Sequence, residues 1–133
     1  KIMTDQVTSI EQSKRLIDLG VPADKASMVW ATCSGKYHLS VLPHYKATPE
    51  YIKSGESIPA FTVADLLGLF KSVIFTTSVL NPNLEKTRDG GWYFEFGEIT
   101  GEEGYGFARN KSLVDLLVGR IEWIVSNGYK LNI

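Results

Sequence analysis

The chain has little cysteine and little histidine, and both shortages narrow the chemistry open to it. Its 133 residues include one cysteine, Cys33, which cannot form an intramolecular disulfide. The two histidines, His38 and His44, stand near Cys33, but the spacing of the three matches no established zinc pattern. We therefore expect no disulfide, no metal site and no cofactor, and a protein of the reducing cytoplasm.

The chain also lacks a strong net charge and a long apolar run. Fourteen basic and fifteen acidic side chains give a net charge of −1, which provides no global field to attract a polyanion. No apolar run approaches the ~20 residues that span a bilayer, and the first residues do not have the pattern of a signal peptide. We expect neither nucleic-acid binding nor membrane insertion.

What is present fits one globular domain. With 44% apolar and 22% charged residues, a chain of 133 residues can bury a core without a metal or a disulfide. The sequence predicts a single domain over residues 1–133, in which residues 1–7 form a flexible lead-in.

Three helices are indicated by their end signals. The first should begin at Thr8 or Ser9 and end at Leu19, because Gly20 can adopt the left-handed conformation that closes a helix. The second and third begin with the same pattern, a hydroxyl residue followed one turn later by an aspartate: Thr62 with Asp65, and Ser112 with Asp115. We expect the second helix to stop near Lys71 and the third to run to Asn127, and we attribute both aspartates to helix capping.

The strands are indicated by short β-branched and aromatic runs. Alternation along 92–98 predicts that Trp92, Phe94 and Phe96 share one face, with Tyr93 and Glu95 on the other. Short connections favour antiparallel pairing, so we predict an α+β fold with about three helices packed on an antiparallel sheet of four to five strands. The expected strands are 28–32, 37–42, 73–79 (closed by the turn 81–83), 92–98 and 105–108.

A long loop is predicted over residues 43–59, where prolines and a glycine interrupt the chain. It carries Tyr45 and Tyr51, residue types that suit protein contact, or it is an ordinary surface excursion. Arg120 is a second candidate binding residue, since it falls on the otherwise apolar side of the last helix. It could meet an anionic ligand or a partner chain, or its methylenes could cover apolar surface.

No catalytic residue can be assigned from recognisable spacing. The glutamates Glu95, Glu98, Glu102 and Glu103 lie near Trp92 and Tyr93, and paired carboxylates beside aromatics are typical of glycosidases. Alternation places Glu95 and Glu98 on opposite faces, however, unless a bulge intervenes at Gly97, and no activating motif surrounds Cys33.

Three segments are similar to one known family. They are IEQSKRLIDLG at 10–20 with ASMVW at 26–30, IPAFTVADLL at 58–67, and residues within 114–129. The chain resembles a family of small uncharacterised proteins of gut Bacteroidales genomes and of their phages and mobile elements. The resemblance implies an α+β fold and a cytoplasmic protein, and it implies no known activity.

These observations favour a small non-enzymatic interaction or accessory module of a phage or mobile element. Its partner would be another protein or a second copy of the chain. The alternative is a small hydrolase-type enzyme that uses glutamates or the Cys33, His38 and His44 side chains.

Overall fold

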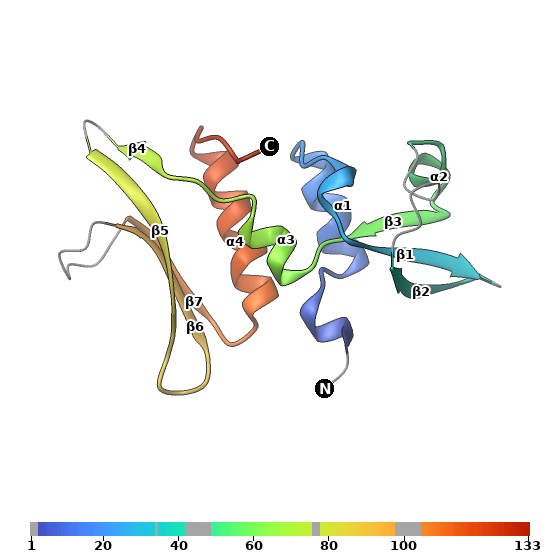
Figure 1. The fold of residues 1–133 in the computed structure, drawn as a ribbon, viewed down its shortest axis with the longest axis horizontal. Helices are drawn as coiled ribbons and strands as arrows, with labels where there is room; N and C mark the ends of the chain where they lie inside the picture. The colour runs from blue at the N-terminus through green and yellow to red at the C-terminus, as the bar shows by residue number, and fades with distance from the viewer. Residues whose placement is uncertain (1–2, 34, 42–48, 76–77, 98–104) are drawn as a thin grey trace. The chain divides into compact units, whose positions relative to one another are not determined.

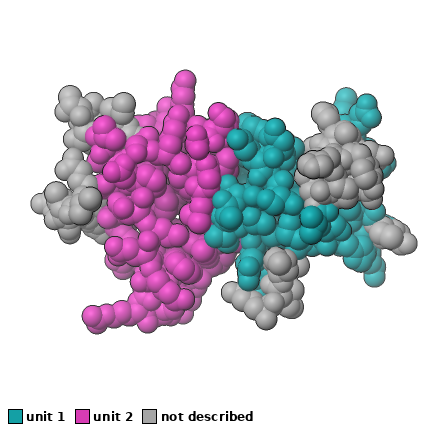
Figure 2. All heavy atoms as spheres, viewed as in Figure 1, with its two compact units in different colours: residues 1–66 teal, residues 67–133 magenta. Residues whose placement is uncertain are grey.

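The α+β class is confirmed by a computed structural model (Figure 1), in which the strands form two antiparallel sheets in place of the single sheet expected. The chain divides into two compact units, Lys1–Leu66 and Leu67–Ile133, which are coloured separately in Figure 2. The structure describes residues 3–33, 35–41, 49–75, 78–97 and 105–133.

In the N-terminal unit, a three-stranded sheet with the order β2-β1-β3 packs against a helix, α1. The first two strands form the expected hairpin, in which Cys33 pairs with Lys36 and Gly35 has a φ of +79°. The elements are η1 (Met3–Gln6), α1 (Ile10–Asp18), η2 (Ala23–Lys25), β1 (Met28–Cys33), β2 (Lys36–Val41), α2 (Pro49–Ser54), β3 (Ser57–Ala60) and α3 (Val63–Leu67).

Both predicted ends of α1 are confirmed. Ser9 is the N-cap, and its side chain and that of Gln12 form a reciprocal capping box. At the other end Gly20 has a φ of +101°, and the amide of Val21 donates to the carbonyl of Leu16. This is the glycine-closed helix end that the sequence indicated.

Two predictions for this unit were wrong. The loop expected over 43–59 contains α2 and β3 in its second half, and Pro59 lies in β3, which is an edge strand that tolerates a missing amide donor. The lead-in expected over 1–7 contains η1, and the buried Val7 bridges Thr62. Residues 1–2 and 42–48 lie outside the described residues.

A buried hydroxyl, that of Thr8, joins three parts of this unit. Its Oγ1 lies 2.7 Å from the hydroxyl of Ser13 on α1 and accepts the amide of Phe61 at 3.0 Å. Its backbone amide donates to the carbonyl of Phe61, and its carbonyl accepts the indole N–H of Trp30 on β1 at 3.0 Å. Thr8 therefore satisfies buried polar groups from a helix, a strand and the segment that precedes α3.

The predicted capping box at Thr62 and Asp65 is confirmed, but Asp65 does more than cap. Each side chain accepts the other's backbone amide, and Asp65 also accepts the amide and the hydroxyl of Ser27. Asp65 thus ties the start of α3 to the residue before β1. The helix itself ends at Leu67, earlier than the expected end near Lys71.

The C-terminal unit consists of a four-stranded antiparallel sheet, order β4-β5-β6-β7, with the long helix α4 against β6 and β7. Among the described residues, no helix is both long enough and apolar enough to cross a membrane. The elements are β4 (Val73–Phe75), β5 (Ser78–Lys86), β6 (Trp92–Gly97), β7 (Tyr105–Asn110) and α4 (Leu113–Ser126).

The long strand β5 corrects the prediction of one strand over 73–79 closed by a turn at 81–83. Its first residues pair with β4, and those from Asn81 onward pair with β6. Pro82 lies within the strand, opposite Phe96, at a position where β4 no longer pairs with β5. A proline without an amide donor is accepted there because that side of the strand has no ladder partner among the described strands.

The predicted alternation of β6 is confirmed for Phe94 and Phe96, whereas Trp92 is only half-buried and a register shift against β7 lies between Phe94 and Phe96. Phe94 and Phe96 are buried, and Phe96 stacks on Trp123 of α4 with ring centroids 5.9 Å apart. Tyr93 and Glu95 share the opposite face, where the Tyr93 hydroxyl donates to Glu95 at 2.9 Å. The buried residues of α4 are Val114, Leu116, Leu117, Val118, Ile121 and Ile124.

The start and end of α4 were located correctly, although one capping contact differs. Ser112 is the N-cap and accepts the amide of Asp115 at 3.2 Å. The amide of Ser112 donates to the side chain of Asn110, which takes the part expected of Asp115. Gly128 has a φ of +80° and closes the helix.

We predict that Thr8→Val lowers the free energy of unfolding by about 2–4 kcal/mol. Valine keeps the shape but leaves the buried Phe61 amide and Ser13 hydroxyl without their partner. Urea unfolding of the purified chain measures the loss. Thr32→Val is the matched control, because its hydroxyl makes an exposed 3.3 Å contact with the carbonyl of Glu56. Equal losses in the two variants would show that the Thr8 network contributes nothing.

Candidate anion-binding site

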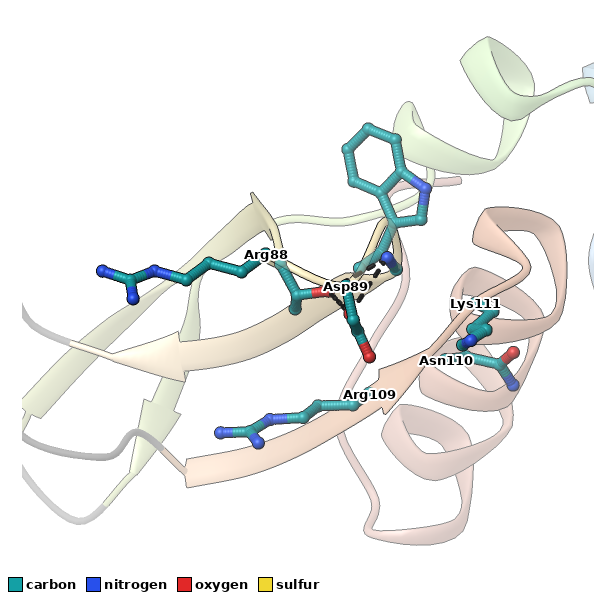
Figure 3. A pocket seen from close by; sticks show the side chains of 8 residues that line it. Arg88, Asp89, Arg109, Asn110 and Lys111 are labelled. Carbon is teal, nitrogen blue, oxygen red and sulfur yellow. Dashed lines mark hydrogen bonds between the residues drawn. The ribbon is translucent and has the colours of Figure 1, made fainter.

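A cavity of about 330 Å³ lies where the β5–β6 turn meets the end of β7 (Figure 3). It belongs entirely to the C-terminal unit. We call it the turn pocket. Its lining residues are Thr87, Arg88, Asp89, Gly91, Trp92, Arg109, Asn110 and Lys111.

Strand pairing brings these two segments together. Trp92 pairs with Lys86 across the β5–β6 hairpin and with Asn110 across the β6–β7 pair. The two segments that line the pocket, the β5–β6 turn and the end of β7, are therefore both held next to Trp92, the first residue of β6. Because neighbouring strands lie about 5 Å apart, the turn residues and the last residues of β7 must meet at this edge of the sheet.

The turn that forms one wall is held by its own hydrogen bonds. The hydroxyl of Thr87 donates to Oδ1 of Asp89, and the amide of Gly91 lies 3.0 Å from the Thr87 hydroxyl and 3.2 Å from Asp89 Oδ1. Gly90 has a φ of +86°, which glycine adopts without strain. The wall is thus held in place by hydrogen bonds within the turn itself.

The carboxylate of Asp89 is stabilised in its charged form. The hydrogen bond from Thr87 is the main cause that lowers the pKa of Asp89, followed by the bond from the Gly91 amide, and the charge of Lys111 acts in the same direction. Asp89 is therefore ionised at neutral pH, with one oxygen engaged in the turn.

Cationic side chains outnumber this carboxylate in the lining. Arg88, Arg109 and Lys111 against Asp89 give a net charge of +2. In Figure 3, Arg88 and Arg109 extend to the same side of Asp89, while Asn110 and Lys111 lie on the other side. The side-chain oxygen of Asn110 accepts the Ser112 amide at 2.9 Å, so Asn110 has its N–H₂ donors to offer a ligand.

Two aromatic residues hold cations at the pocket. The guanidinium of Arg109 lies 5.2 Å from the ring centroid of Tyr93, and the ammonium of Lys86 lies 5.1 Å from that of Trp92. Cation–π contacts of this kind restrict long side chains. Arg109 is consequently positioned before a ligand arrives.

The lining offers hydrogen-bond donors and positive charge, and it has little to offer catalysis. It contains no histidine, cysteine or serine among the described residues. Its one hydroxyl, on Thr87, already donates to Asp89, and a carboxylate with a lowered pKa is a weak general base at neutral pH. The arrangement suits the binding of an anion.

Comparison with known proteins identifies no relative of the chain. No family model, no curated protein and no solved structure matches the chain. The resemblance to proteins of Bacteroidales and their mobile elements stays a prediction, and the function of the turn pocket must be inferred from its own chemistry.

Of the binding residues predicted from the sequence, only the side chain of Arg120 is described, and Arg120 is not among the lining residues of the turn pocket. Tyr45 lies outside the described residues, and Tyr51 belongs to α2 but its side chain is not described. Arg120 lies on α4 with its guanidinium 5.9 Å from the ring centroid of Trp123, and burial lowers its pKa. Trp123 in turn stacks on Tyr129. Arg120 is thus part of an aromatic cluster on the helix.

Of the candidates for hydrolase chemistry, the structure describes the side chains of Glu95 and His38, which belong to different units. Glu95 accepts the Tyr93 hydroxyl on the sheet, and His38 is exposed on β2 in the other unit. The side chain of Cys33 and all of His44 and residues 98–104 are outside the description. Within the described part of the chain, no three His, Cys, Asp or Glu side chains are grouped as metal ligands would be.

Sequence reasoning missed the pocket although a signal existed. Arg88 stands in the Asp-Gly-Gly turn region before β6, and Arg109 and Lys111 follow the run that was expected to end at Ala108. Antiparallel pairing places those two segments at the same edge of the sheet. Extending the last strand to Asn110 would have brought the cations together.

We predict that Gly91→Ala destabilises the turn pocket. An added Cβ would lie 3.1 Å from the Thr87 hydroxyl and 3.2 Å from the Asn110 carbonyl, so the wall must shift at a cost of about 1–3 kcal/mol. Gly119→Ala is the matched control, because nothing lies within 4 Å of its Cβ position on α4. It should stabilise the chain by up to about 1 kcal/mol. Thermal unfolding distinguishes them, and a stabilising Gly91→Ala would contradict the close packing.

We also predict that Asp89 contributes stability only above the acid range. Its folded-state pKa is lowered from 3.8, so the charged form favours folding at neutral pH. That contribution should decline as the pH falls below 3.8 and vanish below the lowered pKa. Urea midpoints of the parent chain and of Asp89→Asn should therefore differ at pH 7 and converge in acid. A difference that persists unchanged in acid would contradict the hydrogen bonding described.

Proposed function

We propose that the protein is a non-enzymatic interaction module whose turn pocket binds an acidic side chain of a partner protein. The observation that carries the proposal is the lining itself, which has a net charge of +2 and presents donors from Arg88, Arg109, Asn110 and Lys111. An accessory role in a phage or mobile element rests on the sequence resemblance alone.

A carboxylate suits this pocket because guanidinium groups donate two parallel N–H bonds to its oxygens. Arg109 is held over Tyr93, which lowers the conformational entropy lost on binding. The cations are exposed, so the attraction is screened by salt. We therefore expect modest affinity that falls as ionic strength rises.

The same features favour binding over catalysis. Asp89 is engaged in the turn and stays ionised, so it holds the wall in place and does not exchange protons near pH 7. A hydrolase would need a nucleophile or a base beside the cations. No described residue of the lining supplies one.

The test is a titration of the ¹⁵N-labelled chain with a short polyglutamate peptide. We expect amide shifts to cluster at residues 87–91 and 109–111 and to shrink when salt is added. The double variant Arg88→Gln/Arg109→Gln should bind roughly tenfold or more weakly, because two charge-assisted contacts are lost.

The matched control is Lys71→Gln/Lys130→Gln. It removes the same charge from exposed positions of the same unit that do not line the pocket. It should bind the peptide almost as well as the parent chain. Equal weakening of the two double variants would mean that only net charge is sensed, and shifts centred elsewhere would place the site elsewhere.

A further inference from the structure

The sheet carries an exposed pair of stacked aromatic rings beside the turn pocket. On the face of the sheet opposite Phe94 and Phe96, the rings of Tyr93 and Phe107 stack with centroids 6.2 Å apart and an interplanar angle of 28°. Phe107 is 49% exposed, although it is a large apolar side chain. We call these two residues the aromatic pair.

The aromatic pair is continuous with the pocket through one side chain. Arg109 lines the pocket, pairs with Tyr93 across the strands, and holds its guanidinium 5.2 Å from the Tyr93 ring centroid. Phe107 lies two residues before Arg109 on β7, so the two side chains emerge about 7 Å apart on the same face. This is also the separation of alternate side chains in an extended peptide.

Carboxylates beside the aromatic pair restrict what can bind over it. Glu95 accepts the Tyr93 hydroxyl, and Glu85 is the cross-strand partner of Tyr93 on β5. Both would repel a second acidic group placed directly over the pair. A nucleic acid, which has a phosphate at every nucleotide, is disfavoured for the same reason, whereas a peptide can place a neutral residue there.

From this geometry we infer the partner's chemistry: an extended peptide segment in which an acidic residue and an aromatic residue are separated by one residue. The acidic side chain binds at Arg109 and Arg88, and the aromatic side chain covers Phe107. The inference rests on the proposed function, since it needs the turn pocket to bind the acidic residue. It adds an apolar contact, between the partner's aromatic side chain and Phe107, to the charged contact at the pocket.

The test compares two peptides of equal charge, Glu-Gly-Trp-Gly-Glu and Glu-Gly-Ala-Gly-Glu, by isothermal titration calorimetry on the full chain. We expect the tryptophan peptide to bind roughly three- to tenfold more tightly, from the added aromatic contact. Phe107→Ser should abolish that advantage while it leaves the alanine peptide unaffected. Arg109→Gln should weaken both peptides.

Val79→Ser is the matched control, because it also removes an exposed apolar side chain from the same sheet. The preference for tryptophan should persist in this variant. The amide spectrum of Phe107→Ser should match that of the parent chain away from β7. Such a match would show that the variant is folded and that its loss of preference for tryptophan is not caused by unfolding. Should that spectrum collapse, Phe107→Leu serves instead, and its preference for tryptophan over alanine should be reduced.

The outcomes separate the two proposals. If both peptides bind equally well, the pocket binds acids and the inference about the aromatic pair is overturned. If neither peptide binds, the proposed function fails together with the inference. If a single-stranded oligothymidylate binds more tightly than the tryptophan peptide, and Phe107→Ser weakens it, the surface recognises nucleic acid and the inference is likewise overturned.

Discussion

The register of β6 is the constraint on which the C-terminal unit depends. Phe94 and Phe96 are buried and pack with Phe70 and Trp123, so the pleat of the strand turns Tyr93 and Glu95 to the other face. A slip of one residue would expose two phenylalanines. Burial of the core thereby determines which side chains remain available for binding.

The proposed binding surface inherits its geometry from that register. Trp92 has Lys86 on one side and Asn110 on the other, and Tyr93 has Arg109 beside it, as the pairing of β6 with β5 and β7 sets them. The turn adds a wall whose polar groups satisfy one another. Cations around the pocket are exposed, and their placement by aromatic rings compensates in part for the weak attraction of exposed charges.

Local signals in the sequence were sufficient to predict where most helices begin or end and which phenylalanines of β6 are buried. The residues that begin or close these helices, such as Ser9, Thr62 and Gly128, contact residues only a few positions away in the chain. Such contacts can be inferred without knowledge of the fold. The loop prediction misses the helix α2 and the strand β3 because prolines, here at 49 and 59, are also typical of loops. Proline is compatible with the first turn of a helix and with an edge strand, which is where these two lie.

The candidate site needed information that no local pattern contains. Arg88 and Arg109 come together only through the pairing of three strands, and the end of β7 at Asn110 decides whether Arg109 reaches the turn. Charge counted along the chain showed a glutamate-rich segment instead, since cations from separate strands do not form a run in the sequence. Asp65 was likewise assigned to capping alone, because its contact with Ser27 depends on the tertiary fold.

The Thr8 network has a consequence for the order in which the chain folds. The bond between Thr8 and Phe61 joins residues 53 positions apart, whereas the β5–β6 hairpin joins its two strands through a short turn. Closing a long loop costs more chain entropy than closing a short one, and contacts of high sequence separation generally slow folding. The Thr8 network therefore forms late within its own unit, since Thr8 must wait for Phe61 to be synthesised before its hydroxyl finds a partner there.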